Sequence, residues 1–87
     1  MQSALVELFG TFVFVSIVLL SPADILLVAA GLAAAVAFSR HAGPAHLNPA
    51  VTTAMYVQRR ITAMQYVMFV ASQLAGALLA VAWSALA

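Results

Sequence analysis

The chain has 87 residues, of which 67% are hydrophobic and 6% are charged, and its formal net charge is +1. A soluble domain carries about 25% charged residues, so this chain cannot make a solvated surface and we expect lipid to be its main solvent. It has no basic run that would indicate nucleic-acid binding, and no cysteine for a disulfide or a thiolate metal site. Its two histidines and two acidic residues are too few and too scattered to predict a metal centre. No nucleophile–base set or cofactor cradle is present, so we predict neither an enzyme nor a cofactor.

The first apolar run, residues 3–20, approaches the roughly 20 residues that a helix needs to cross a bilayer. No basic segment precedes it and no Ala-x-Ala cleavage site ends it, so a permanent span is expected rather than a signal peptide. Ser21 then suits the N-cap and Pro22 the first position of a second helix, and Asp24 completes a capping-box pattern. These signals predict a second span over residues 22–38.

Residues 39–48 differ from the runs around them, because they contain Gly43, Pro44 and two histidines, and they predict a non-helical connection. A short helix over residues 49–57 follows, with about two turns, too short to span a bilayer. A capping-box pattern in residues 62–65 then opens a third span over residues 62–85. The sequence therefore predicts an all-α membrane protein with three transmembrane helices and one re-entrant half-helix.

Charge and small residues give the expected orientation and packing. Arg40, Arg59 and Arg60 all fall on the side of the N-terminus, whereas Asp24 falls on the other side. The positive-inside rule then predicts a cytoplasmic N-terminus, in a plasma (inner) membrane. Gly76 belongs to a small-residue face of the third span with a spacing of four, which favours close helix packing.

Asn48 and Pro49 mark the start of the half-helix, at the depth of the membrane. Such a helix start has unpaired N–H groups and partial positive charge, so it must be buried in protein or line a water-filled path. As N-cap, Asn48 can use its carbonyl oxygen to accept a backbone N–H and turn its NH2 group toward a permeating solute. The loop carbonyls of residues 44–47 are the expected acceptors along the same path, with pairing to other protein groups as the alternative.

Four segments of the chain resemble the first half of the aquaporin (major intrinsic protein) family in order and spacing. They are Glu7-Leu8-Phe9-Gly10-Thr11-Phe12, Gly31-Leu32, His46-Leu47-Asn48-Pro49-Ala50-Val51-Thr52 and Gln73-Leu74-Ala75-Gly76-Ala77. The resemblance covers nearly the whole chain and implies a single half-aquaporin repeat over residues 1–87. Family members have two inverted repeats with six spans, and two half-helices that meet at the bilayer centre. They conduct water and in some cases glycerol or other small neutral solutes, usually as tetramers with one pore per monomer.

The resemblance also implies roles for individual residues. Asn48, Pro49, Ala50 and the loop residues Ala45, His46 and Leu47 would line the pore, with Pro49 and Ala50 letting two half-helix tips approach. Glu7 and Gln73 would anchor the loop, the alternative for Glu7 being a proton relay. For His46 a loop-fixing hydrogen bond is favoured over a pH-sensitive gate. Gly10 and Gly76 would be close-contact points between helices.

The selectivity filter and the loop depart from the family's usual pattern. The second-span filter position aligns near Ala30, or near Val28 in the alternative register, and neither residue is aromatic. Val51 follows the Asn-Pro-Ala, so no filter arginine is present and a wide pore that passes glycerol as well as water is expected. Gly43-Pro44 stands where the family commonly has Ser-Gly.

A single repeat needs an inverted partner to close a pore. An antiparallel second copy, possible in a tetramer of dimers, would supply it, although the three arginines oppose insertion in both orientations. A separate second-half chain would supply it too, as would a longer gene product of which this chain is a fragment. The rival hypothesis is a non-conducting membrane protein that assembles with full-length aquaporins and alters them.

Overall fold

The computed structural model describes residues 2–87 and shows an all-α membrane protein. Its helices in chain order are α1 (Gln2–Leu20), α2 (Ile25–Ser39), α3 (Pro49–Val57) and α4 (Ala63–Ser84). By length and composition, α1 and α4 can each cross a membrane, whereas α2 is a shorter apolar helix of 15 residues. The span predicted over residues 22–38, which corresponds to α2, therefore stays a prediction.

The start of α2 differs from the prediction. The helix begins at Ile25 and not at Pro22, and its N-cap is Asp24 rather than Ser21. The Asp24 carboxylate accepts the backbone N–H of Leu27 at 2.9 Å. Asp and Ser are comparably good N-caps. Asp24 stands directly before the apolar run and has the extended backbone of an N-cap, so the helix begins at Ile25. Residues 21–23 form the turn that precedes it.

The starts of α3 and α4 agree with the sequence prediction. Asn48 is the N-cap of α3, and its Oδ1 accepts the N–H of Ala50 at 2.7 Å. Thr62 is the N-cap of α4 and forms a complete capping box with Gln65, with hydrogen bonds of 3.1 and 2.8 Å. These caps satisfy backbone donors that a helix start would otherwise leave free.

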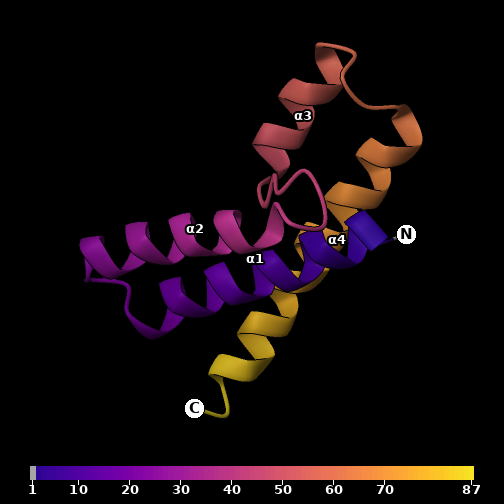
Figure 1. Ribbon diagram of the computed structural model, residues 1–87. Coiled ribbons are helices and arrows are strands. Elements are labelled where there is room, and N and C mark those ends of the chain that lie inside the picture. The colour runs from indigo at the N-terminus through magenta and orange to yellow at the C-terminus, as the bar shows by residue number, and fades with distance from the viewer. Residues whose placement is uncertain (1) are drawn as a thin grey trace.

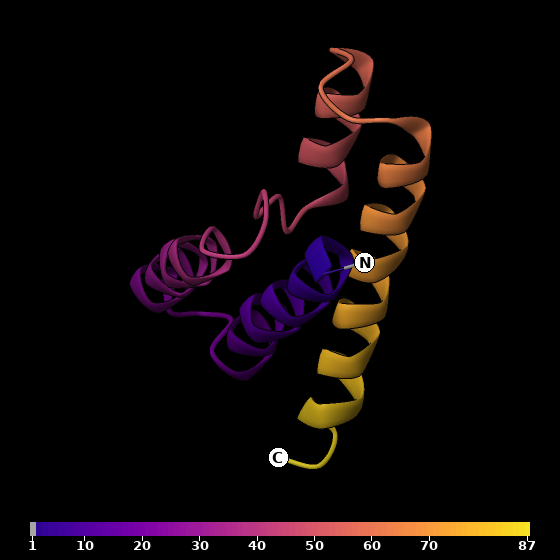
Figure 2. The same ribbon diagram turned by 45° about the vertical axis from the view of Figure 1, so that its right-hand side comes forward.

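The four helices form an open arrangement around α1 (Figures 1 and 2). α1 packs against α4 on one side and α2 on the other, and α3 packs against the first part of α4. Glycines permit the closest approaches. A Cβ atom on Gly76 would lie 2.3 Å from the carbonyl oxygen of Leu8, and one on Gly10 would lie 2.6 Å from the side chains of Leu47 and Ser39. Gly76 therefore brings the α1 and α4 backbones together, and Gly10 makes room for the loop.

Several polar side chains lie inside this arrangement, and many large apolar ones lie outside. Leu26 on α2 is 81% exposed and Phe38 is 72% exposed, whereas Glu7 and Thr52 are both 0% exposed. A soluble protein distributes these residue types the other way round. The apolar exterior fits a lipid environment. The buried polar side chains, which include Glu7 and Thr52, mark the candidate functional site.

Candidate functional site

The loop between α2 and α3 has an unusual backbone. Ala45 and Leu47 are both left-handed, with φ angles of 58° and 55°. A left-handed residue other than glycine costs about 1–3 kcal/mol and persists where surrounding contacts impose it. Neither residue type favours this conformation, so the sequence alone did not indicate it. Glu7 hydrogen-bonds to the backbone of this stretch at His46 and Leu47.

Glu7 is the centre of the site. It lies on α1, and its Oε2 accepts the backbone N–H of His46 at 2.9 Å while its Oε1 accepts that of Leu47 at 2.8 Å. Oε1 also accepts the side-chain N–H of Gln73, on α4, at 2.9 Å. A buried carboxylate needs such donors, because burial removes it from water. The three hydrogen bonds hold the loop backbone against α1 and α4.

Thr52 on α3 completes the buried network and was missed by the sequence analysis. Its Oγ1 accepts a second N–H from Gln73 at 2.8 Å, and it lies 3.0 Å from Nδ1 of His46. The His46 ring also meets Phe69 edge-on, with 5.4 Å between ring centroids. In the sequence, only the spacing of four residues between Asn48 and Thr52, which places both on one face of the helix, could have indicated this role of Thr52. The network therefore joins α1, the loop, α3 and α4.

Asn48 lies at the exposed edge of this network. Its Oδ1 caps α3, which fixes the amide, and its Nδ2 group donates no hydrogen bond within the described part of the chain. Pro49 is half-buried and Ala50 is exposed beside it. The carbonyl oxygens of residues 44–47 likewise accept no backbone hydrogen bond from residues 2–87. Asn48 thus has two N–H groups without a partner among the described residues, and the residues just before it in the chain have carbonyls without a backbone donor.

The other residues predicted to line the path lie in different places. The side chains of Ala45 and Leu47 are buried, and Leu47 packs toward Gly10. Ala30 is exposed and Val28 half-buried on α2. Ala30 lies within α2, about 13 Å along the helix axis before its end at Ser39, and its place in a pore stays a prediction.

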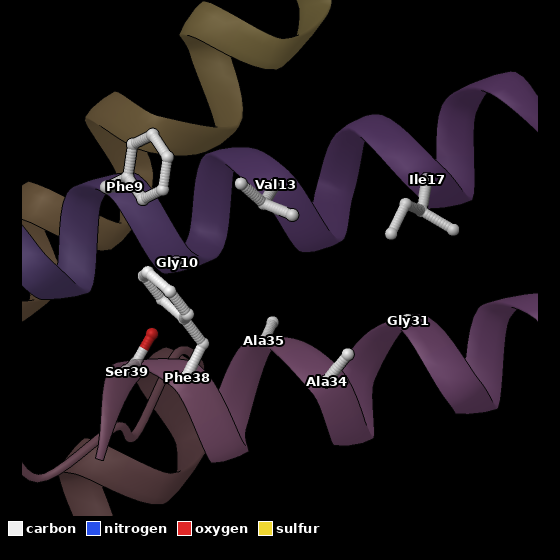
Figure 3. A pocket seen from close by; sticks show the side chains of 9 residues that line it. All are labelled: Phe9, Gly10, Val13, Ile17, Gly31, Ala34, Ala35, Phe38 and Ser39. Atoms are coloured by element: carbon white, nitrogen blue, oxygen red, sulfur yellow. The ribbon is translucent and has the colours of Figure 1, made fainter. Parts of the chain in front are cut away.

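An open groove of about 310 Å³ lies between α1 and α2 (Figure 3). Small residues such as Gly31 and Ala35 face α1 across it, and the rings of Phe9 and Phe38 lie at one end. Ser39 is the only side chain in its lining that bears a polar atom. The side chains that line this groove are almost all apolar, whereas the hydrogen-bonding network lies at the loop and the start of α3.

Comparisons of the sequence with known proteins give a family match and similar proteins. The sequence profile of the family described as "Major intrinsic protein" matches residues 1–86. The chain is 53% identical over 53 residues to "Probable aquaporin TIP3-2" of Oryza sativa subsp. japonica, covering 61% of this chain and 20% of that protein. It is 34% identical over 88 residues to "Glycerol uptake facilitator protein-like 6" of Lactiplantibacillus plantarum, covering 92% of this chain and 41% of that protein.

No solved structure matches the chain significantly. The chain spans less than half the length of these curated relatives. Because the family profile covers nearly every residue, including the buried network and the Asn48 cap, this chain belongs to the major intrinsic protein family.

Proposed function

We propose that this chain is a membrane channel subunit for the passive passage of water and of small neutral solutes such as glycerol. The observation that carries the proposal is the exposed start of α3, where Asn48 has a fixed amide with free N–H groups. Both relatives carry a channel or facilitator name, which supports the same function. The absence of an aromatic residue at Ala30 or Val28 supports a pore wide enough for glycerol.

The proposed mechanism follows from the polarity of the site. Asn48 donates to the oxygen of a passing water or hydroxyl group, and the free loop carbonyls accept its hydrogens. The positive end of the α3 dipole, at the same place, disfavours cations. A solute without charge can exchange its water partners for these groups in small steps, whereas an ion loses more hydration than the site replaces.

We further propose that an inverted second copy or a partner half completes the pore. The described chain has one half-helix, α3, and covers 41% of the glycerol facilitator relative, which supports the proposal that it supplies half of a family-type pore. Among the described helices, α2 contacts only α1, so its outer face is open to such a neighbour. An N-terminus in the cytoplasm and a place in the plasma (inner) membrane belong to the same proposal.

Permeability of purified protein in liposomes tests the function. We expect stopped-flow water and glycerol fluxes above those of protein-free liposomes, and a fall in both of about 3- to 10-fold for Asn48→Asp, which removes donors worth about one hydrogen bond. The matched control is Gln58→Glu, the same amide-to-acid change at the other end of α3, which should leave both fluxes unchanged.

Fluxes equal to those of bare liposomes would contradict the channel proposal and favour the non-conducting alternative. Water flux without glycerol flux would contradict the wide pore only.

Topology and mass test how the pore is completed. A reporter fused after Ala87 should appear on both sides of the membrane if antiparallel copies pair, and the particle in detergent should then contain an even number of chains. A single C-terminal location excludes the antiparallel pair and requires a partner half. A conducting monomer of 9.1 kDa would contradict both forms of the proposal.

A further inference from the structure

Tyr66 on α4 makes a contact with α3 that lies outside the buried network. We propose that it is a positioning residue, which sets the direction of the Asn48 amide through Thr53 and Pro49. The positioning itself is argued from hydrogen bonds within the chain. Its effect on permeation rests on the proposed channel function, because the direction of the amide matters to a solute only if solutes pass it.

A short chain of hydrogen bonds joins Tyr66 to the first residue of α3. The Tyr66 hydroxyl lies 3.0 Å from Thr53 Oγ1, and the Thr53 hydroxyl donates to the Pro49 carbonyl oxygen at 2.8 Å. A carbonyl oxygen only accepts, so the hydroxyl proton of Thr53 goes to Pro49, and Tyr66 must donate to Thr53. The reverse direction would leave the Thr53 and Pro49 oxygens 2.8 Å apart with no proton between them. The hydroxyl proton of Tyr66 is therefore directed at α3.

The Tyr66 ring is also held against α3. It stacks on the ring of Tyr56, with 4.7 Å between ring centroids and 3° between ring planes. Nearly parallel rings at this distance are a favoured arrangement of aromatic pairs. Tyr66 is half-buried, and it contacts α3 both at Thr53 and at Tyr56. The stack thus restricts the ring whose hydroxyl bonds to Thr53.

The orientation of α3 depends on its contacts with α4. Among the described helices, α3 packs against α4 alone (Figure 2). On the buried side Thr52 accepts from Gln73, and on the exposed side Thr53 accepts from Tyr66. The two α4 residues lie about two turns apart on one face of that helix. Two bonds at such separate points fix both the rotation and the tilt of α3, which a single bond would leave open.

The attachment reaches Asn48 through the first turn of α3. Pro49 directly follows Asn48, and Asn48 Oδ1 accepts the N–H of Ala50 at 2.7 Å. The side-chain amide of Asn48 is therefore fixed to the same turn that Tyr66 holds through the Pro49 carbonyl. A rotation of this turn about the helix axis would rotate the NH2 group with it. Tyr66 thereby sets the direction in which Asn48 presents its donors.

Nitrogen-15 NMR tests the positioning without any transport. Asn48 is the only asparagine of the chain, so asparagine labelling gives one side-chain NH2 pair that needs no further assignment. We expect Tyr66→Phe, which removes only the hydroxyl, to shift or broaden the signals of this pair. The matched control is Tyr56→Phe, the same change on the other ring of the stack, whose hydroxyl makes no hydrogen bond to the described residues. It should leave the Asn48 signals unchanged.

Thr53→Val tests the route of the connection. It keeps the shape of the side chain and removes the oxygen between Tyr66 and Pro49, so it should also shift the Asn48 signals. Adding Tyr66→Phe to it should then change little, because both substitutions break one connection. Unchanged Asn48 signals in Tyr66→Phe overturn the proposal, and so do equal shifts in Tyr66→Phe and Tyr56→Phe. Additive shifts in the double variant overturn the route through Thr53.

The ratio of glycerol flux to water flux tests the effect on permeation. Glycerol must align several hydroxyl groups, whereas water reorients freely, so a misdirected Asn48 amide should slow glycerol more. We expect Tyr66→Phe to lower the ratio about 2- to 10-fold, the value of one neutral hydrogen bond, and Tyr56→Phe to leave it unchanged. A loss of folded protein lowers both fluxes by the same factor, so a merely structural role would not move the ratio.

The two experiments separate the proposal from the channel function. Shifted Asn48 signals with an unchanged flux ratio overturn the effect of Tyr66 on permeation. An absence of flux in the wild type contradicts the proposed function, while the NMR result still decides whether Tyr66 positions the amide.

Discussion

Glu7→Ala is expected to abolish permeability and to destabilise the protein by about 3–5 kcal/mol, the cost of removing one partner from a buried charged network. The substitution leaves the N–H groups of His46 and Leu47 and the amide of Gln73 without their shared acceptor. These donors are buried or nearly so, and each unsatisfied donor costs about 1–3 kcal/mol. Leu47, whose backbone is left-handed, then loses the hydrogen bond from its N–H group to Glu7.

Glu7→Gln should give an intermediate result, because the amide keeps one acceptor oxygen but turns an NH2 group toward other donors. Thermal unfolding in detergent measures the loss of stability, and stopped-flow flux in liposomes measures the loss of permeability. The control is Asp24→Ala, which removes the other acid of the chain and costs only the N-cap of α2, about 1 kcal/mol. Wild-type flux in Glu7→Ala would show that the carboxylate does not hold the loop.

The parts of the fold that could be predicted are those fixed by short-range hydrogen bonds. The starts of α3 and α4 depend on Asn48, and on Thr62 with Gln65, whose bonds reach two or three residues along the chain. The start of α2 could not be placed as well, since two good caps stand three residues apart and nothing local separates them.

The buried network depends on contacts between distant parts of the sequence. Glu7 meets the loop 39 and 40 residues later, and this partnership was expected only from the family resemblance, since no spacing rule indicates it. Thr52 meets Gln73 over 21 residues and on another helix, and it was missed. The left-handed Ala45 and Leu47 run against local preference, so only the folded surroundings explain them.

Gly76→Ala is the second substitution for which a large effect is expected, because its added methyl group meets backbone. The new Cβ would lie 2.3 Å from the Leu8 carbonyl oxygen and 3.1 Å from the Phe12 nitrogen. No rotamer change relieves a contact with backbone, so α1 and α4 must separate. We expect a loss of about 3 kcal/mol, at the upper end of the usual range for overpacking, and Gly76→Leu should not fold.

The separation of α1 and α4 also disturbs the candidate functional site. Glu7 precedes Leu8 on α1, and Gln73 lies almost one turn before Gly76 on α4, so moving the helices apart lengthens the 2.9 Å bond between them. Permeability should therefore fall together with the unfolding temperature. The matched control is Gly43→Ala, where the new Cβ would lie 3.6 Å from Ser3, an ordinary contact at a backbone angle open to alanine. That control should change neither quantity, and equal effects of the two substitutions would contradict the close α1–α4 approach as the basis of the loop's position.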